Sequence, residues 1–102
     1  MDPLVIKNRQ ALDSLCAEFK VRRLELFGSA ANADGDGASN DLDFLIEFED
    51  MAPRDYSEAY FGLLDALTAL FKKPVDLVVI SSVSNPYFLR SIEPTRTLLY
   101  AA

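Results

Sequence analysis

The sequence predicts a small α/β (α+β) domain that occupies residues 1–102 as a single unit. Segments with apolar residues at helical spacing alternate with short runs typical of β-strands. Half of the residues are hydrophobic and a quarter are charged, which is an ordinary globular composition. A chain of 102 residues has room for one modest core. We therefore expect a largely buried sheet of three or four strands with helices packed on it.

The elements are expected in the order helix, strand, strand, helix, strand, helix. Asp2 and Pro3 form a typical helix start, because aspartate caps backbone N–H groups and proline suits the first helical position. Pro74 ends the long second helix, and Asn85-Pro86 begins the last one. The expected elements are helix 3–18, strand 21–27, strand 41–48, helix 55–71, strand 75–80 and helix 84–92, with 97–100 as a tail that docks or adds a strand.

Two aspartates at the start of the second expected strand are the most informative feature of the chain. Asp41 and Asp43 stand one residue apart, and residues i and i+2 of a strand share one face. Like charges this close repel, so a compensating cation is expected. Asp76 begins the next strand, and the three carboxylates can converge if the two strands are neighbours. Oxygen donors of this kind suit Mg²⁺ or Mn²⁺.

A tight turn precedes this strand. The stretch LELFGSA reads as a strand that runs into Gly28-Ser29, where the absence of a glycine side chain lets a phosphate approach the backbone. A small, polar, glycine-bearing loop follows and leads to the D-x-D strand. Together these features indicate metal-assisted handling of a nucleotide.

Composition excludes several classes of function. The chain has no histidine, which removes Ser-His-Asp and Cys-His nucleophiles and His-ligated zinc. The single Cys16 cannot form an internal disulfide, and the N-terminus has an acid where a secretory signal would have lysine or arginine, so we expect a cytoplasmic protein. No stretch approaches the roughly 18 apolar residues of a membrane helix. The net charge of −6 argues against direct nucleic-acid binding and favours a basic protein partner or a nucleotide delivered with its metal.

The spaced set of Gly28-Ser29, Asp41-Leu42-Asp43 and Asp76 resembles the DNA polymerase β-type nucleotidyltransferase superfamily. The short length and the ending NPYFLRSIEPTRTLLY are similar to its smallest branch, the minimal nucleotidyltransferases. Members of this branch are often encoded beside HEPN-domain proteins as toxin–antitoxin pairs. A Gly-Ser pair or a D-x-D alone is weak evidence, whereas the spaced set with a third acid is strong.

The resemblance implies a mixed sheet backed by helices and a role for each site residue. Gly28 and Ser29 would hold the phosphates of ATP, Asp41 and Asp43 would bind Mg²⁺ or Mn²⁺, and Asp76 would complete the metal site and assist deprotonation of the attacking hydroxyl. The implied reaction transfers AMP from ATP to a hydroxyl. In antitoxin members, the acceptor resembles a tyrosine of the partner HEPN ribonuclease toxin, which the modification silences.

One departure and three alternatives accompany this interpretation. The family pattern usually reads G-S-x-A-R-G, and Asn32 stands where the arginine is expected, which keeps open a non-catalytic antitoxin that neutralises its partner by binding alone. Transfer onto RNA is a weaker alternative, because the chain is acidic. The loop 32–43 has near EF-hand spacing, but it lacks the glutamate at position twelve and is flanked by expected strands, not helices.

Overall fold

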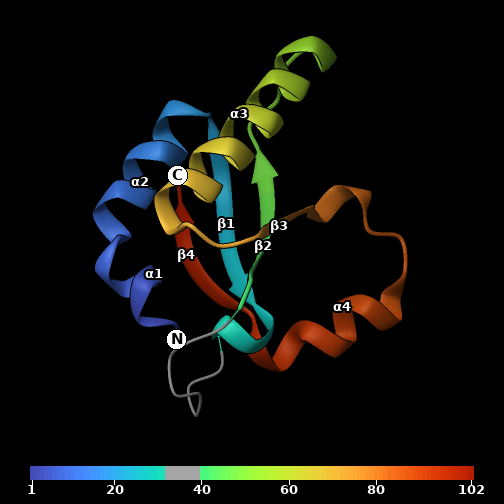
Figure 1. Cartoon of the computed structure of the whole chain (residues 1–102). Coiled ribbons are helices and arrows are strands. Elements are labelled where there is room, and N and C mark those ends of the chain that lie inside the picture. The colour runs from blue at the N-terminus through green and yellow to red at the C-terminus, as the bar shows by residue number, and fades with distance from the viewer. Residues whose placement is uncertain (32–39) are drawn as a thin grey trace.

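Four strands form one mixed sheet in the order β3-β2-β1-β4. The computed structural model describes residues 1–31 and 40–102 (Figure 1). β1 pairs antiparallel with β2 and with β4, and β2 pairs parallel with β3. The mixed sheet expected from the resemblance is confirmed, and the segment after residue 96 adds the fourth strand. The strands are β1 (Val21–Phe27), β2 (Leu42–Phe48), β3 (Val75–Val79) and β4 (Thr97–Ala101).

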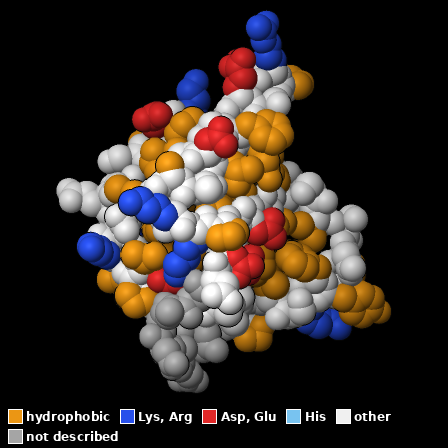
Figure 2. All heavy atoms as spheres, in the orientation of Figure 1, with side chains coloured by type: hydrophobic (Ala, Val, Ile, Leu, Met, Phe, Trp, Pro, Cys, Tyr) orange, Lys and Arg blue, Asp and Glu red, His pale blue; other side chains and the backbone are white. Residues whose placement is uncertain are grey.

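The helices lie on the two faces of this sheet. α2 and α3 cover one face, while α4 packs on the other (Figure 1). The N-terminal turns of α3 extend beyond the sheet, and hydrophobic side chains are visible along them in Figure 2. No helix within the described residues is both long and apolar enough to cross a membrane. The helices are α1 (Pro3–Lys7), α2 (Arg9–Glu18), α3 (Pro53–Phe71) and α4 (Pro86–Ile92), and three 3₁₀ turns are η1 (Gly28–Ala31), η2 (Ile80–Ser82) and η3 (Glu93–Thr95).

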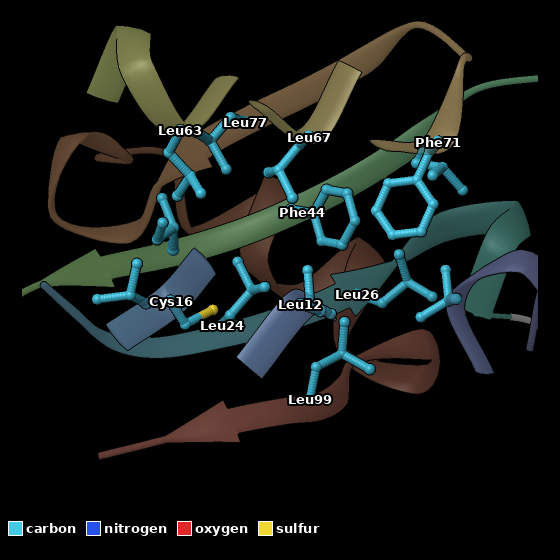
Figure 3. Packing of buried hydrophobic residues seen from close by; sticks show 14 of the residues in the cluster. Leu12, Cys16, Leu24, Leu26, Phe44, Leu63, Leu67, Phe71, Leu77 and Leu99 are labelled. Atoms are coloured by element: carbon cyan, nitrogen blue, oxygen red, sulfur yellow. The ribbon is translucent and has the colours of Figure 1, made fainter. Parts of the chain in front are cut away.

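The main core lies between the sheet and the helices α2 and α3. Alternate residues of β2 point into it, as the period of two in the sequence predicts, and they meet apolar residues of α3 that recur at helical spacing (Figure 3). Phe44 stacks against Phe71 with ring centroids 6.1 Å apart. The buried side chains of β2 and α3 in this core are Leu42, Phe44, Ile46, Phe48, Leu63, Leu67 and Phe71.

Helix boundaries are where the sequence prediction was wrong. The helix expected over 3–18 is two helices that meet at Asn8, where the backbone has φ −104° and ψ 19°. The Asn8 side chain donates a hydrogen bond to the Leu4 carbonyl at 2.8 Å, a local bond that competes with helical backbone geometry. α3 begins at Pro53 instead of residue 55, because proline fits the first helical turn even with Ala52 as a cap that makes no side-chain hydrogen bond.

The other face of the sheet carries a smaller apolar cluster and a group of charges. Phe27 and Leu45 of the sheet are buried together with Ile92 of α4. Two residues before Phe27 on β1, the Glu25 side chain is only 5% exposed and accepts hydrogen bonds from Arg96 and Arg23. Arg96 binds both carboxylate oxygens, with its Nε 3.0 Å from Oε1 and its Nη2 2.9 Å from Oε2. This bidentate ion pair joins β1 to Arg96, which lies between η3 and β4.

Glu25→Gln should reduce the stability of the fold in a pH-dependent way. The Arg96 hydrogen bonds hold the pKa of Glu25 below its usual value of 4.5, against the opposing effect of burial. A lowered folded-state pKa gives stability that is present above pH 4.5 and is lost as pH falls through the folded-state pKa. At pH 7 the substitution should cost about 2 kcal/mol, since it weakens hydrogen bonds between charged groups.

Thermal or urea unfolding of both proteins between pH 3 and 7 measures this difference. The difference should shrink toward acidic pH, because the wild-type carboxylate is then protonated. Glu93→Gln is the matched control, since Glu93 also binds Arg96 but its side chain is 68% exposed. A difference between wild type and Glu25→Gln that stays constant with pH would contradict the ionic role of Glu25.

Candidate functional site

Parallel pairing of β2 and β3 brings two of the predicted aspartates together. Asp43 and Asp76 are direct partners in the strand register, so their side chains lie side by side on one face of the sheet. That face is the one opposite α2 and α3, because the flanking Leu42 and Phe44 are buried in the main core. Figure 2 shows acidic side chains gathered over the part of the sheet where β2 and β3 run next to each other.

The electrostatics of this pair depend on a third carboxylate. The pKa of Asp43 is raised from its usual value of 3.8, first by burial and then by the negative charges of Asp41 and Asp76. Asp41 precedes β2 and is exposed, whereas Asp43 is half-buried. Asp41, Asp43 and Asp76 are therefore close enough for the first and last to act electrostatically on Asp43. The interaction is centred on Asp43, whose ionised form is disfavoured by burial and by these charges and would be favoured by a nearby cation.

The turn after β1 lies directly against this acid. Gly28 has φ +76°, a left-handed conformation that favours glycine. A Cβ at this position would lie 2.8 Å from the Asp43 Oδ2 atom, closer than real side chains approach. Ser29 follows Gly28 in η1 and is exposed. Glycine is thus required here both for its backbone conformation and for its close approach to Asp43.

The Gly28 N–H group already has a partner. It donates to the Thr95 hydroxyl oxygen at 2.9 Å, and the Thr95 hydroxyl donates to the Ile92 carbonyl at 2.9 Å. In this arrangement the Gly28 N–H does not point at a phosphate. Any phosphate contact of the turn then falls to Ser29 and the residues after it, while Gly28 provides the space.

The N-terminal segment ties the turn to the strand that carries Asp76. The backbone N–H of Asp2 donates to the Ala30 carbonyl at 2.7 Å, and its buried carboxylate accepts from Lys73 at 3.0 Å. The next residue, Pro74, accepts a backbone hydrogen bond from Leu42 at 3.0 Å. The segments that hold Ser29, Asp43 and Asp76 are therefore connected through Asp2, Lys73 and Pro74.

The donor chemistry of the site fits a hard divalent cation. The carboxylates of Asp43 and Asp76 supply oxygen ligands, and Cys16 is buried far into the main core, where burial raises the pKa of its thiol to about 12. Among residues 1–31 and 40–102, no group of three or more Asp, Glu, His or Cys side chains is arranged to hold a metal ion by itself. Mg²⁺ is commonly bound by one or two carboxylates, with water and substrate phosphates completing its shell.

Sequence reasoning found the acids and the turn but missed the residues that support them. Asp2 was predicted only as a helix cap, and it does accept from the Leu4 N–H at 2.9 Å. Its link to Lys73, and the link of Thr95 to Gly28, join positions 71 and 67 residues apart and carry no local sequence signal. The expected loop positions 32–39, including Asn32 and most of the EF-hand-like spacing, lie outside the described residues.

Comparison with known proteins gives the family of the chain. The family model of the nucleotidyltransferase domain matches residues 8–99. The chain belongs to this nucleotidyltransferase family. Two proteins of Methanocaldococcus jannaschii, provisionally named protein adenylyltransferases, are 36% and 38% identical to it over 76 residues. Each match covers 74% of this chain and 74% of the relative. The enzyme class is accordingly nucleotidyltransferase.

Solved structures share the fold of this nucleotidyltransferase. One, provisionally described as a minimal nucleotidyltransferase, is 29% identical, has a TM-score of 0.69, and matches over 94% of both chains. Another is a complex of a tri-AMPylated HEPN toxin with its MNT antitoxin from Shewanella oneidensis. It is 19% identical, with a TM-score of 0.65, over 94% of this chain and 71% of that chain. A third is a toxin–antitoxin structure with AMP-PNP, 20% identical, with a TM-score of 0.68, over 93% of this chain and 74% of that chain.

Gly28→Ala should distort the turn and destabilise the fold. The new methyl group would meet the Asp43 carboxylate at 2.8 Å, and alanine would also be strained at φ +76°. We expect a loss of about 1–3 kcal/mol, the usual cost of a strained backbone position. Chemical denaturation measures it. Gly62→Ala is a comparison for the backbone strain, because its methyl group would meet a similarly close contact, 2.6 Å from the Phe19 Cε1 atom, but its backbone is helical. Unchanged stability of Gly28→Ala would show that the turn can relax away from Asp43.

Asp43→Asn should leave the metal-free protein at least as stable as wild type at pH 7. The raised pKa of Asp43 means that its ionised form is disfavoured by folding, a penalty that is absent below pH 3.8 and complete above the folded-state pKa. The variant removes the penalty, so its stability relative to wild type should grow from pH 3 to 7. Melting temperatures of both proteins in EDTA test this. A large fall in the melting temperature of the variant would instead assign Asp43 a structural role.

Proposed function

We propose that this protein transfers AMP from ATP to a tyrosine hydroxyl of a partner HEPN ribonuclease toxin, with Mg²⁺ as cofactor, and thereby acts as its antitoxin. The single observation that carries the proposal is the register of Asp43 beside Asp76, with the Gly28 turn against Asp43. Phosphoryl transfer depends mainly on positioning and charge neutralisation. A turn that phosphates can approach would position them, and paired carboxylates would bind the metal ion that neutralises their charge.

Each residue has a distinct role in this reaction. Ser29 is exposed at the turn and contacts the phosphates, and Gly28 keeps the approach open. Asp41 and Asp43 would hold Mg²⁺ or Mn²⁺, and the bound ion would supply positive charge to neutralise the phosphates and the attacking oxygen. Asp76 completes this set and accepts the proton of the acceptor hydroxyl.

The proposed reaction is a single displacement at the α-phosphorus of ATP. The hydroxyl oxygen of the acceptor forms a bond to the α-phosphorus of ATP, and the bond from that phosphorus to the bridging oxygen of pyrophosphate breaks. The hydroxyl proton passes to the carboxylate of Asp76, and pyrophosphate leaves with the electron pair of the broken bond. Asp76 is suited to this transfer because it is exposed at the sheet edge, next to the half-buried Asp43.

The relatives support the identity of nucleotide and acceptor. The two archaeal relatives are named for adenylyl transfer to proteins. Among proteins of the same fold, one antitoxin is bound to an AMPylated HEPN toxin and another toxin–antitoxin structure contains AMP-PNP. The net charge of −6 favours docking on a basic protein surface and disfavours nucleic acid. Such a partnership fits a cytoplasmic protein.

Incubation with a cognate HEPN partner, ATP and Mg²⁺ should add whole AMP units to the partner. Intact-mass spectrometry followed by peptide mapping identifies the number of units and the residue that carries them. Asp43→Asn and Asp76→Asn should reduce transfer by at least about 100-fold, in the range expected when a group acting on developing charge or a proton is removed. EDTA should abolish it.

Asp65→Asn is the matched control, because Asp65 is an exposed acid of α3 whose loss removes the same charge. It should transfer AMP as wild type does. If the partner is silenced with unchanged mass, and Asp43→Asn silences it equally well, the protein is an antitoxin that acts by binding alone.

A further inference from the structure

The segment η3, which precedes β4, lies beside the turn after β1 that holds Ser29. Thr95 accepts the Gly28 N–H at 2.9 Å, and its own proton is committed to the Ile92 carbonyl. A hydroxyl has a single proton to donate, so this second bond fixes the direction of the lone pair that faces Gly28. Thr95 is partly buried, and its contact with Gly28 joins residues 67 positions apart.

The residue next to Thr95 fixes this segment to β1. Arg96 binds both oxygens of the buried Glu25, and the Arg96 N–H donates to the Ile92 and Glu93 carbonyls at 3.1 and 3.3 Å. Bidentate pairing of this kind restricts orientation as well as distance. Glu25 lies on the same strand that leads into the Gly28 turn, so Thr95 is held at a defined place relative to that turn.

The turn has little freedom to adopt another position. The turn passes close to the Asp43 carboxylate, because a Cβ on Gly28 would lie 2.8 Å from the Asp43 Oδ2 atom. On the other side it is restrained by Thr95, and at its end the Asp2 N–H binds the Ala30 carbonyl. A shift that lost the Thr95 contact would change the distance between the Ser29 side chain and Asp43.

We infer that Thr95 is a positioning residue for nucleotide binding, which sets the place of the Gly28-Ser29 turn relative to Asp43 without itself contacting the nucleotide. This inference rests on the proposed function. Thr95 acts through the partly buried Gly28 N–H, which without the hydroxyl would lose its hydrogen-bond partner in the protein. The hydroxyl is the essential group. Serine at position 95 should therefore retain nucleotide binding, whereas valine, which has the same shape without the hydroxyl, should weaken it.

Three variants separate this role from a general effect on folding. Thr95→Val should weaken binding of Mg²⁺·ATP by up to about tenfold, the affinity equivalent of one hydrogen bond, and Thr95→Ser should bind within about twofold of wild type. Thr68→Val is the matched control, since it removes a hydroxyl bond to a backbone carbonyl, that of Leu64, on the exposed side of α3. Calorimetry with Mg²⁺·ATP measures the affinities.

A second measurement follows the contact directly. In ¹⁵N-labelled protein without nucleotide, the Gly28 amide resonance should shift in Thr95→Val and stay near its wild-type position in Thr95→Ser and Thr68→Val. Equal nucleotide affinity of wild type and Thr95→Val, or an unmoved Gly28 resonance, would overturn the inference. Wild-type protein that does not bind Mg²⁺·ATP would instead overturn the proposed function, and this inference with it.

Discussion

Parallel pairing between β2 and β3 is the constraint on which the site depends. It holds the carboxylates of Asp43 and Asp76 side by side, against their mutual repulsion, because the strands are fixed by apolar contacts on the opposite face. Leu42 and Phe44 on one strand and Leu77 on the other are buried in the main core. A slip of one residue would place an aspartate in that core, so the register is strongly determined. The fold stabilises an arrangement of charges that would not persist by itself.

The turn and its supports extend this arrangement to a third strand. Gly28 lies close to the Asp43 carboxylate, and its N–H donates a hydrogen bond to Thr95. The ion pairs Glu25–Arg96 and Asp2–Lys73 hold the neighbouring segments in place. Both ion pairs involve a carboxylate that is at most 5% exposed. A buried carboxylate that lost its partner would be costly, so each pair specifies one position for the segment that it holds. These contacts lie outside the predicted motif, yet they set its geometry.

Local sequence patterns predicted most of the fold and the acids of the site. β2 presents Leu42, Phe44, Ile46 and Phe48 to the main core as expected, although Leu45 on the other face is also buried. Asp76 of β3 is the register partner of Asp43. The patterns failed where a local hydrogen bond decided the backbone, as at Asn8. They also could not reveal Thr95, Arg96 or Lys73, because each is an ordinary surface-type residue whose role comes from a partner about 70 residues away.

The position of β4 at the edge of the sheet has a consequence for how the chain is made. β1 pairs with β4 on one side, so the backbone groups of that side lack their strand partner until β4 has been synthesised. An open strand edge in a partly made chain invites pairing with other chains. β1 carries Arg22, Arg23 and Glu25 within its first five residues, and charged side chains of this kind oppose such pairing. Arg23 and Glu25, which pair with each other and with Arg96 in the finished fold, would place charge on this strand before Arg96 has been synthesised.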